Sequence, residues 1–212
     1  MLFLLFIRTL RQKSGFLTRI QQSEIIVIIV FMPNWCFTDV RVVGPHGQVE
    51  KLYLMMKGLE DMMMPLVENG FGTRWYGNLV HLLGGDCQKI HCRGHWAELR
   101  MPTSVLKWVD MSAWGPVVDV FKLIERKFPG LKVYFWAEEE CNDVFVTNDA
   151  DGRFFKARFF LATDWDSEYY DDEASLLQAA SAQAGREFLS MEGLWDYVFQ
   201  SSEWSLHEIE II

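Results

Sequence analysis

Three consecutive glutamates, Glu138, Glu139 and Glu140, are the residues of this chain best suited to acid–base chemistry. They end a strand-like stretch, where alternation places Glu138 and Glu140 on one face and Glu139 on the other. A carboxylate held against apolar neighbours has a raised pKa and can act as a general acid or base, or pair with Arg93. A solvated sheet edge or a structural salt bridge explains the same pattern and is the commoner outcome. The sequence offers no nucleophile or phosphate-binding loop that would complete a reaction.

The densest charge cluster holds six acids within ten residues, with aromatic residues among them. Its acids are Asp164, Asp166, Glu168, Asp171, Asp172 and Glu173. Such a segment suits a basic protein partner. A loop before a helix N-terminus also favours acids, because the helix dipole is positive there, and that explanation needs no partner. The sequence leaves both explanations open.

Large amphipathic residues gather around a glycine-rich stretch and the segments that follow it. The candidate binding residues here are Trp75, Tyr76, Asn78, Arg93, Trp114 and Trp136, together with Glu138 and Glu139. Core packing explains most such aromatic residues, whereas a ligand or partner groove is the functional alternative.

Cys87, His91, Cys92 and His95 combine the side chains that usually bind zinc. Their spacing is wrong, because the adjacent His91 and Cys92 would point to opposite faces of a strand. Cys92 is better explained as a small buried residue. We therefore predict no metal and no cofactor.

Charge and cysteine content exclude several classes of protein. The 212 residues carry 20 Lys or Arg and 29 Asp or Glu, a formal net charge of −9. This balance argues against sequence-independent binding of nucleic acid. Four unevenly spaced cysteines make no disulfide framework, and the longest apolar run, Ile25 to Met32, is too short to span a membrane. We expect a cytoplasmic protein without a transmembrane segment.

Residues 1–31 differ in kind from residues 32–212. They carry four bases and one acid, a net charge of +3, which leaves −12 for the other 181 residues. Two apolar patches flank the basic stretch, a pattern that fits a membrane-surface anchor. It also fits upstream sequence translated from a misplaced start, with the native protein beginning at Met32, and we favour this second interpretation.

Residues 32–212 predict a single α+β domain. Period-two alternation and turn residues predict strands over 37–44, 88–92, 96–101, 105–111, 131–139, 144–147, 154–163 and 206–211. Apolar residues on one face predict helices over 45–60 and 115–128, and two further helices are expected over 172–184 and 191–199. Residues 61–86 are expected to form an irregular insertion, and the acidic run a loop. Asp151 and Gly152 predict a two-residue hairpin turn. The order of these elements fits the split strand–helix–strand arrangement of ferredoxin-like folds best.

Short motifs add a family resemblance over about residues 32–165. They are Met32 to Cys36 with Gly44 and Pro45; Gly77 to Val80 with Leu83 to Gly85; Cys92 to Gly94; Ala113, Trp114 and Pro116; Ala137 to Glu139; and Thr147 to Asp149 with Gly152. This pattern resembles the YubB-type ferredoxin-like family, bacterial proteins often carried by plasmids, phages and other mobile elements.

The resemblance implies a ferredoxin-like βαββαβ core over about residues 32–165, and it brings no catalytic residues to this chain. We expect an antiparallel sheet with helices on one face, an inserted loop and a C-terminal helical extension over residues 166–212. We therefore expect a small accessory protein of a mobile element that binds another macromolecule through the aromatic groove or the acidic loop. The alternative is an enzyme or small-ligand-binding protein that uses Glu138, Glu139, Arg93 and Trp114.

Overall fold

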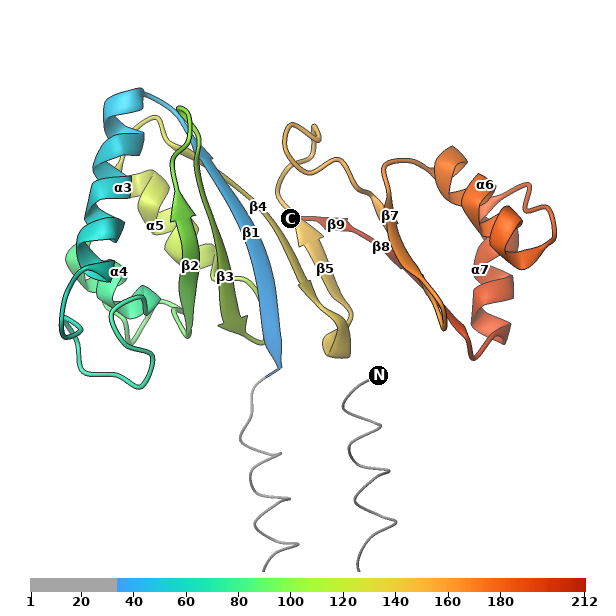
Figure 1. Ribbon diagram of the computed structural model, residues 1–212, viewed down its shortest axis with the longest axis horizontal. Helices are drawn as coiled ribbons and strands as arrows, with labels where there is room; N and C mark the ends of the chain where they lie inside the picture. Colours follow the sequence, from blue (N-terminus) through green and yellow to red (C-terminus); the bar gives the residue numbers. More distant parts are fainter. Residues whose placement is uncertain (1–33) are drawn as a thin grey trace, which may run out of the picture. The chain divides into compact units, whose positions relative to one another are not determined.

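A computed structural model describes residues 34–212, so the predictions for residues 1–31 and for the Met32–Pro33 opening lie outside the described residues. Six strands form the first sheet, in the order β2-β3-β1-β4-β5-β9 (Figure 1). Their bounds are β1 Trp35–Val43, β2 Gly94–Arg100, β3 Leu106–Ala113, β4 Lys132–Glu139, β5 Val144–Thr147 and β9 Glu210–Ile211. Neighbouring strands are antiparallel, except that β5 and β9 are parallel.

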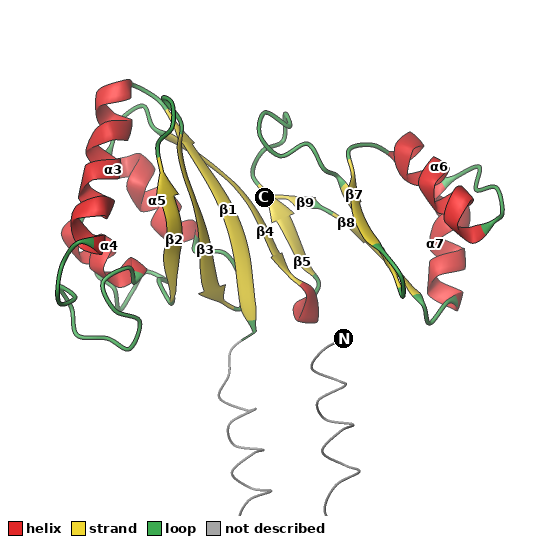
Figure 2. Ribbon diagram, viewed as in Figure 1, coloured by secondary structure: helices red, strands yellow, loops and turns green. Residues whose placement is uncertain are grey.

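Three helices, α3 (His46–Glu60), α4 (Tyr76–Leu82) and α5 (Val118–Lys127), lie on one face of this sheet (Figure 2). Alternate residues of β1, β3 and β4 are buried beneath them, as period-two strands with one covered face require. The helices predicted over 45–60 and 115–128 are confirmed by α3 and α5. Most residues of their apolar stripes are buried, and Leu52 and Ile124 are fully buried.

A second, three-stranded antiparallel sheet has the order β7-β6-β8. Its strands are β6 Phe159–Thr163, β7 Ser167–Tyr170 and β8 Trp204–Glu208. The predicted C-terminal helices are confirmed as α6 (Glu173–Ala184) and α7 (Met191–Gln200). They close a separate core with Leu161, Leu176 and Leu194 at its centre. The boundary predicted at residue 165 therefore falls inside the β6–β7 turn rather than between two structural parts.

Aromatic side chains join the two sheets where the first sheet has no helices. Phe145 of β5 stacks on Phe160 of β6 at 5.0 Å between ring centroids and on His207 of β8 at 4.4 Å. The hydroxyl of Tyr169 donates to Glu138 across the same junction. Residues 34–212 consequently form one compact unit.

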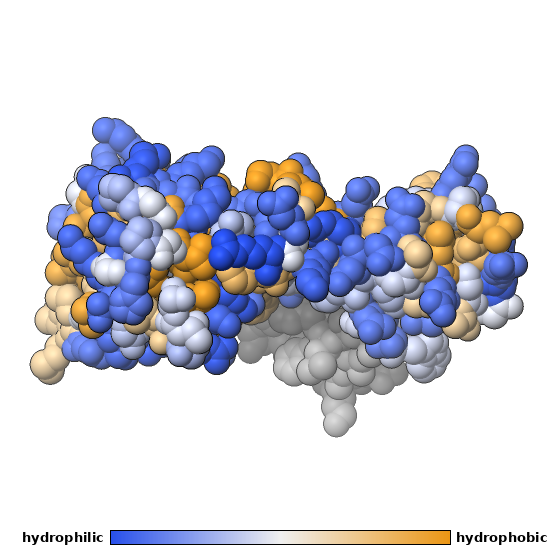
Figure 3. All heavy atoms as spheres, turned by 90° about the horizontal axis from the view of Figure 1, so that it is seen from above, coloured by the Kyte–Doolittle hydropathy of each residue, from blue (hydrophilic) through white to orange (hydrophobic). Residues whose placement is uncertain are grey.

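Hydrophilic residues cover most of the face seen in Figure 3, and hydrophobic residues form smaller patches between them. The most exposed large apolar side chains include Trp165, Leu189 and Phe199, at 92%, 85% and 92%. Within residues 34–212, no helix has both the length and the apolar composition needed to cross a bilayer.

Two predictions for residues 61–92 are wrong. The insertion contains α4, whose glycine at position 77 hid the helical pattern. A Cβ there would lie 2.1 Å from the Trp75 ring, so packing requires the glycine. The strand predicted over 88–92 is a turn instead, because Asp86 accepts the backbone N–H groups of Gln88, Lys89 and Ile90. The predicted three-strand meander is therefore a β2–β3 hairpin.

The hairpin predicted at Asp151–Gly152 is also wrong. Gly152 turns the chain with φ at +64°, but β5 and β6 belong to different sheets. The carboxylate of Asp149 accepts the N–H groups of Arg153, Phe154 and Phe155, which keeps these donors from a strand ladder. The strand predicted over 154–163 consequently begins only at Phe159. The predicted acidic loop contains β7, and the predicted strand 206–211 is divided between β8 and β9.

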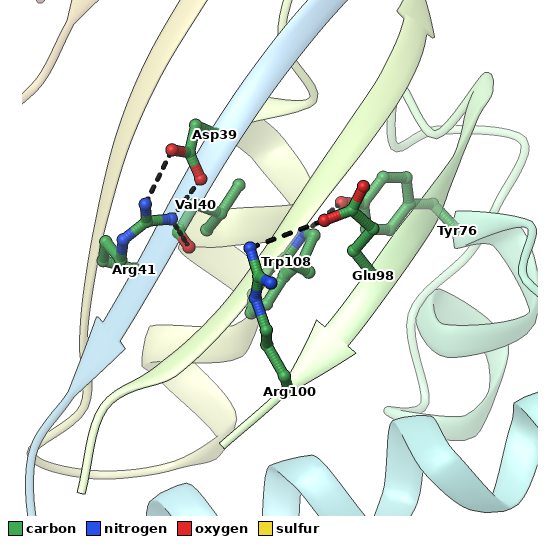
Figure 4. Close-up of polar contacts among 7 residues, drawn as sticks. All are labelled: Asp39, Val40, Arg41, Tyr76, Glu98, Arg100 and Trp108. Atoms are coloured by element: carbon green, nitrogen blue, oxygen red, sulfur yellow. Dashed lines mark hydrogen bonds and ion pairs between the residues drawn. The ribbon is translucent and has the colours of Figure 1, made fainter. Parts of the chain in front are cut away.

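A buried polar chain connects α4 to the sheet, and Figure 4 shows two of its members, Tyr76 and Trp108. The Trp108 indole donates to the Tyr76 hydroxyl at 2.7 Å, and that hydroxyl donates to Asp110 Oδ2 at 2.7 Å. Asp110 is only 1% exposed and forms no ion pair with the described residues. Burial raises its pKa to about 7, although hydrogen bonds from Tyr76, Thr38 and Ser112 act in the opposite direction. The core thus favours a protonated Asp110.

We expect Asp110→Asn to remove a pH-dependent cost of folding. The folded-state pKa is raised, so the contribution of Asp110 to stability should fall as pH rises from about 4 to about 7. The variant should gain relative to wild type by up to about 1.4 kcal/mol per pH unit over this range. Urea denaturation of both proteins at several pH values measures the difference. Parallel stability profiles would contradict a raised Asp110 pKa.

Candidate functional site

A pocket lined by three carboxylates lies at the β6–β7 turn and has a volume of about 370 Å³. It is lined by Thr163, Asp164, Trp165, Asp166, Gln183, Ala184, Tyr197, Glu203 and Trp204. These residues come from the turn, from the C-terminal end of α6, from α7 and from the start of β8. Three carboxylates and three aromatic rings therefore surround one pocket, which we call the acidic pocket.

Thr163 fixes the shape of the turn. Its backbone N–H donates to the carbonyl of Asp166 at 2.7 Å. Its hydroxyl accepts the N–H groups of Trp165 and Asp166 at 3.4 and 3.2 Å. The Asp166 carboxylate accepts the N–H of Ser167 at 2.9 Å. These bonds hold the turn while the Trp165 ring remains 92% exposed at the rim of the pocket.

The aromatic wall already binds a guanidinium group. Tyr197 and Trp204 meet edge to face at 5.3 Å between ring centroids. The Arg186 guanidinium lies 5.3 Å from the centroid of Tyr197 and 5.0 Å from that of Phe188. Cation–π attraction of this kind strengthens when the cation leaves water. The rings of the acidic pocket thus belong to a cluster whose chemistry suits cations.

Its carboxylates have no cationic partner. No described ion pair includes Asp164, Asp166 or Glu203, and none of the lining residues is Lys or Arg. Arg186 lies against the Tyr197 ring but forms no ion pair with these acids, and three like charges without ion pairs favour a positively charged group nearby. No set of three or more His, Cys, Asp or Glu side chains within residues 34–212 is arranged to hold a metal ion. The three carboxylates are therefore spread around the pocket rather than gathered on one point.

The other acids of the run serve different purposes. Asp172 is the N-cap of α6 and accepts the N–H of Ser175 at 2.8 Å, a bond that lowers the pKa of Asp172. Glu173 lies in the first turn of that helix. Glu168 accepts the Tyr170 hydroxyl at 3.2 Å, and Asp171 is exposed beside the cap. Helix capping therefore explains Asp172, whereas Asp164 and Asp166 line the pocket.

The aromatic candidates do not form a single groove. Tyr76 is fully buried in the core, and Asn78 holds the preceding loop through the carbonyls of Gly72 and Thr73. Trp114 is 52% exposed and has a left-handed backbone with φ at 73°. Trp136 lies on the face opposite the helices, where its ring meets Tyr169 edge to face at 5.0 Å.

Glu138 and Glu139 lie on opposite faces of β4, as alternation predicts. Glu138 accepts the Tyr169 hydroxyl at the junction between the sheets, and burial followed by the Glu138 contact raises the pKa of Tyr169. Glu139 is only 4% exposed and caps the short 3₁₀ helix η1 (Glu140–Asn142) by accepting the N–H of Cys141 at 2.9 Å. The two carboxylates therefore do not combine in one acid–base pair.

The structure brings Trp75 and Arg93 together in a second pocket, beside Cys87, His91 and Cys92. Cys92 is 4% exposed and its thiol contacts the carbonyl of Cys87 at 3.6 Å. Burial raises the pKa of Cys92 to about 11, so its thiol is packed as a small apolar group.

Sequence reasoning missed Tyr197, Glu203 and Trp204. These residues lie more than 30 positions from the acidic turn in sequence, and the pairing of Thr163 with Trp204 in the second sheet brings them beside it. The alternating pattern of a strand does not show which other strand it pairs with, so the sequence did not predict the pairing of β6 with β8. The only local indication of the site was Glu203 beside Trp204 at the start of β8.

Separate substitutions of the capping acid Asp172 and of the pocket acids Asp164 and Asp166 should distinguish their roles. We expect Asp172→Ala to lower the urea midpoint, because α6 loses its cap. The double variant Asp164→Asn/Asp166→Asn should keep or raise the midpoint, because it removes unpaired like charges. Urea denaturation followed by circular dichroism measures both. A larger loss of stability in the double variant would show that these acids hold the fold instead.

Comparisons with known proteins add no residue to this site. No protein-family model, no curated protein and no solved structure matches the chain. The candidate site is therefore defined by the geometry of residues 163–204 alone.

Proposed function

We propose that this protein is a macromolecule-binding module that captures a basic segment of a protein partner in the acidic pocket. The observation that carries this proposal is the grouping of three unpaired carboxylates with three aromatic rings around one pocket. An arginine or lysine side chain matches both parts, since its charge pairs with the carboxylates and its flat or aliphatic portion packs on the rings.

Trp165 supports an interface rather than an incidental acidic surface. Binding energy at protein interfaces concentrates on tryptophan, tyrosine and arginine. A tryptophan exposed at 92% on a turn held by hydrogen bonds needs little ordering when a partner packs on it. The same carboxylates would repel a phosphate backbone, which favours a protein partner over nucleic acid.

The geometry favours binding over catalysis. The carboxylates that were candidates for acid–base chemistry are engaged on opposite faces of β4, one with Tyr169 and one with Cys141. The acidic pocket contains no His, Cys, Lys or Arg that would complete a nucleophile–base pair.

We also infer that residues 34–139 form a ferredoxin-like core. The order β4-β1-β3-β2, the antiparallel pairing and helices between β1 and β2 and between β3 and β4 support this assignment. Membership of the YubB-type family, a mobile-element role and a cytoplasmic location stay predictions from the sequence.

Isothermal titration with a tetra-arginine peptide tests the proposed function. Asp164→Asn/Asp166→Asn/Glu203→Gln should weaken binding at least about tenfold, roughly 1.4 kcal/mol. The matched control, Glu168→Gln/Asp171→Asn/Glu173→Gln, removes the same charge from the neighbouring acids and should change affinity by less than about threefold. A tetra-citrulline peptide of similar shape without charge should not bind.

Equal losses in the two triple variants would contradict the proposal, because they would show attraction to net charge alone. Failure of the wild-type protein to bind the peptide at millimolar concentration would also contradict it. Trp165→Ala separates the aromatic contribution, and we expect it to weaken binding without changing the number of charges.

A further inference from the structure

The pocket that contains Trp75 and Arg93 has the opposite character. It has a volume of about 340 Å³ and is lined by Phe71, Trp75, Cys87, Gln88, Lys89, Ile90, His91, Cys92 and Arg93. No Asp or Glu lines it, although the chain as a whole is acidic. We call it the basic pocket. Its volume falls within the lower range for small-molecule sites.

The positive charge here is only partly neutralised. Lys89 pairs with Asp86 of the same turn at 3.2 Å, and Asp86 does not line the pocket. Arg93 is exposed and forms no ion pair with the described residues. Arg74 lies nearby as well, since its charge adds to burial in lowering the pKa of His95, but its guanidinium pairs with Glu60 at 3.5 Å. An anion entering the pocket would therefore meet Arg93 without displacing a carboxylate from it.

Hydrogen-bond donors without acceptors line the same turn. The backbone N–H groups of His91, Cys92 and Arg93 have no acceptor among the described residues. The Trp75 indole N–H is buried and likewise has no acceptor there. A buried donor such as the Trp75 N–H normally has a partner, and runs of backbone N–H groups commonly bind anions.

The walls are held in place before any ligand binds. The Trp75 ring lies against Gly77, and the Asp86 carboxylate fixes the turn by accepting the N–H of Gln88 at 2.9 Å. The carbonyl of Arg93 accepts the N–H of Ala113 at 2.9 Å, which joins the turn to the end of β3. Preformed walls reduce the cost of ordering a site upon binding.

We infer that the basic pocket binds a small molecule in which an oxyanion is joined to a planar ring. Arg93, Lys89 and the free backbone donors would hold the oxyanion. Trp75 and Phe71 provide aromatic surface for the ring, since a planar ring can stack or pack edge-on against an aromatic side chain. A phosphate ester and an aromatic carboxylate share this chemistry, and the experiment distinguishes them.

Titration followed by ¹⁵N–¹H NMR should use adenosine monophosphate, benzoate, adenosine and inorganic phosphate as separate probes. We expect one of the two ring-bearing anions to shift the Trp75 indole signal and the amide signals of residues 91–93. Adenosine and inorganic phosphate should each bind at least about tenfold more weakly than that anion. Preference for the nucleotide would identify a phosphate ester, and preference for benzoate an aromatic carboxylate.

Arg93→Gln should weaken binding of the preferred anion roughly tenfold, because it loses a charged hydrogen bond. Arg126→Gln, an equal charge change on the exposed side of α5, should leave the affinity within about twofold. The inference is overturned if neither ring-bearing anion binds at millimolar concentration, or if inorganic phosphate binds as tightly as the preferred anion. It is also overturned if Arg93→Gln and Arg126→Gln bind the preferred anion with equal affinity. This experiment is independent of the acidic pocket and of the peptide titration.

Discussion

The course of the chain depends on one buried carboxylate, that of Asp149. It is 1% exposed and accepts three consecutive backbone N–H groups, from Arg153, Phe154 and Phe155, at 2.6 to 3.0 Å. Burial alone would raise the pKa of Asp149, but these bonds and the charge of Arg158 lower it. The Arg158 guanidinium in turn donates to the carbonyls of the same loop, including those of Asp149 and Ala150. The loop after β5 therefore cannot fold back as a hairpin strand.

This constraint makes a second sheet possible. The chain leaves the first sheet at Thr147, builds β6, β7, α6, α7 and β8, and returns to pair β9 with β5. The backbone N–H of Ile209 donates to the carbonyl of Arg158 at 2.8 Å, which ties the returning segment to the loop. All residues that line the acidic pocket lie in the segment between β5 and β9. The pocket therefore depends on the loop after β5, which Asp149 holds.

Sequence reasoning found the elements whose pattern is local. The helices α3, α5, α6 and α7 each carry an apolar stripe, and β1, β4 and β5 show alternation or short apolar runs. It failed where long-range packing decided the outcome. Gly77 weakened the helical pattern of α4 because a tryptophan ring occupies the space of a side chain. The acidic sequence of β7 predicted a loop rather than a strand. Its pairing with β6 depends on the course of the chain after β5, which Asp149 determines.

The candidate site shows the same division. The sequence identified Asp164 and Asp166 as part of an acidic run, but it could not separate them from Asp172, which caps a helix. That separation requires knowing which strands pair, because Glu203 and Trp204 arrive beside the turn only through β8. Likewise, Trp75 and Arg93 were both candidates, and their common pocket follows from the turn that replaced a predicted strand.

Two pockets of opposite charge thus lie on one chain, each with aromatic walls. The nine tryptophan indole N–H groups provide a direct test of which pocket receives a basic partner. When a tetra-arginine peptide is titrated into the ¹⁵N-labelled protein, the indole signals of Trp165 and Trp204 should shift while that of Trp75 stays unchanged. Shifts at Trp75, or the absence of any shift at Trp165 and Trp204, would contradict the assignment of the acidic pocket as the binding site.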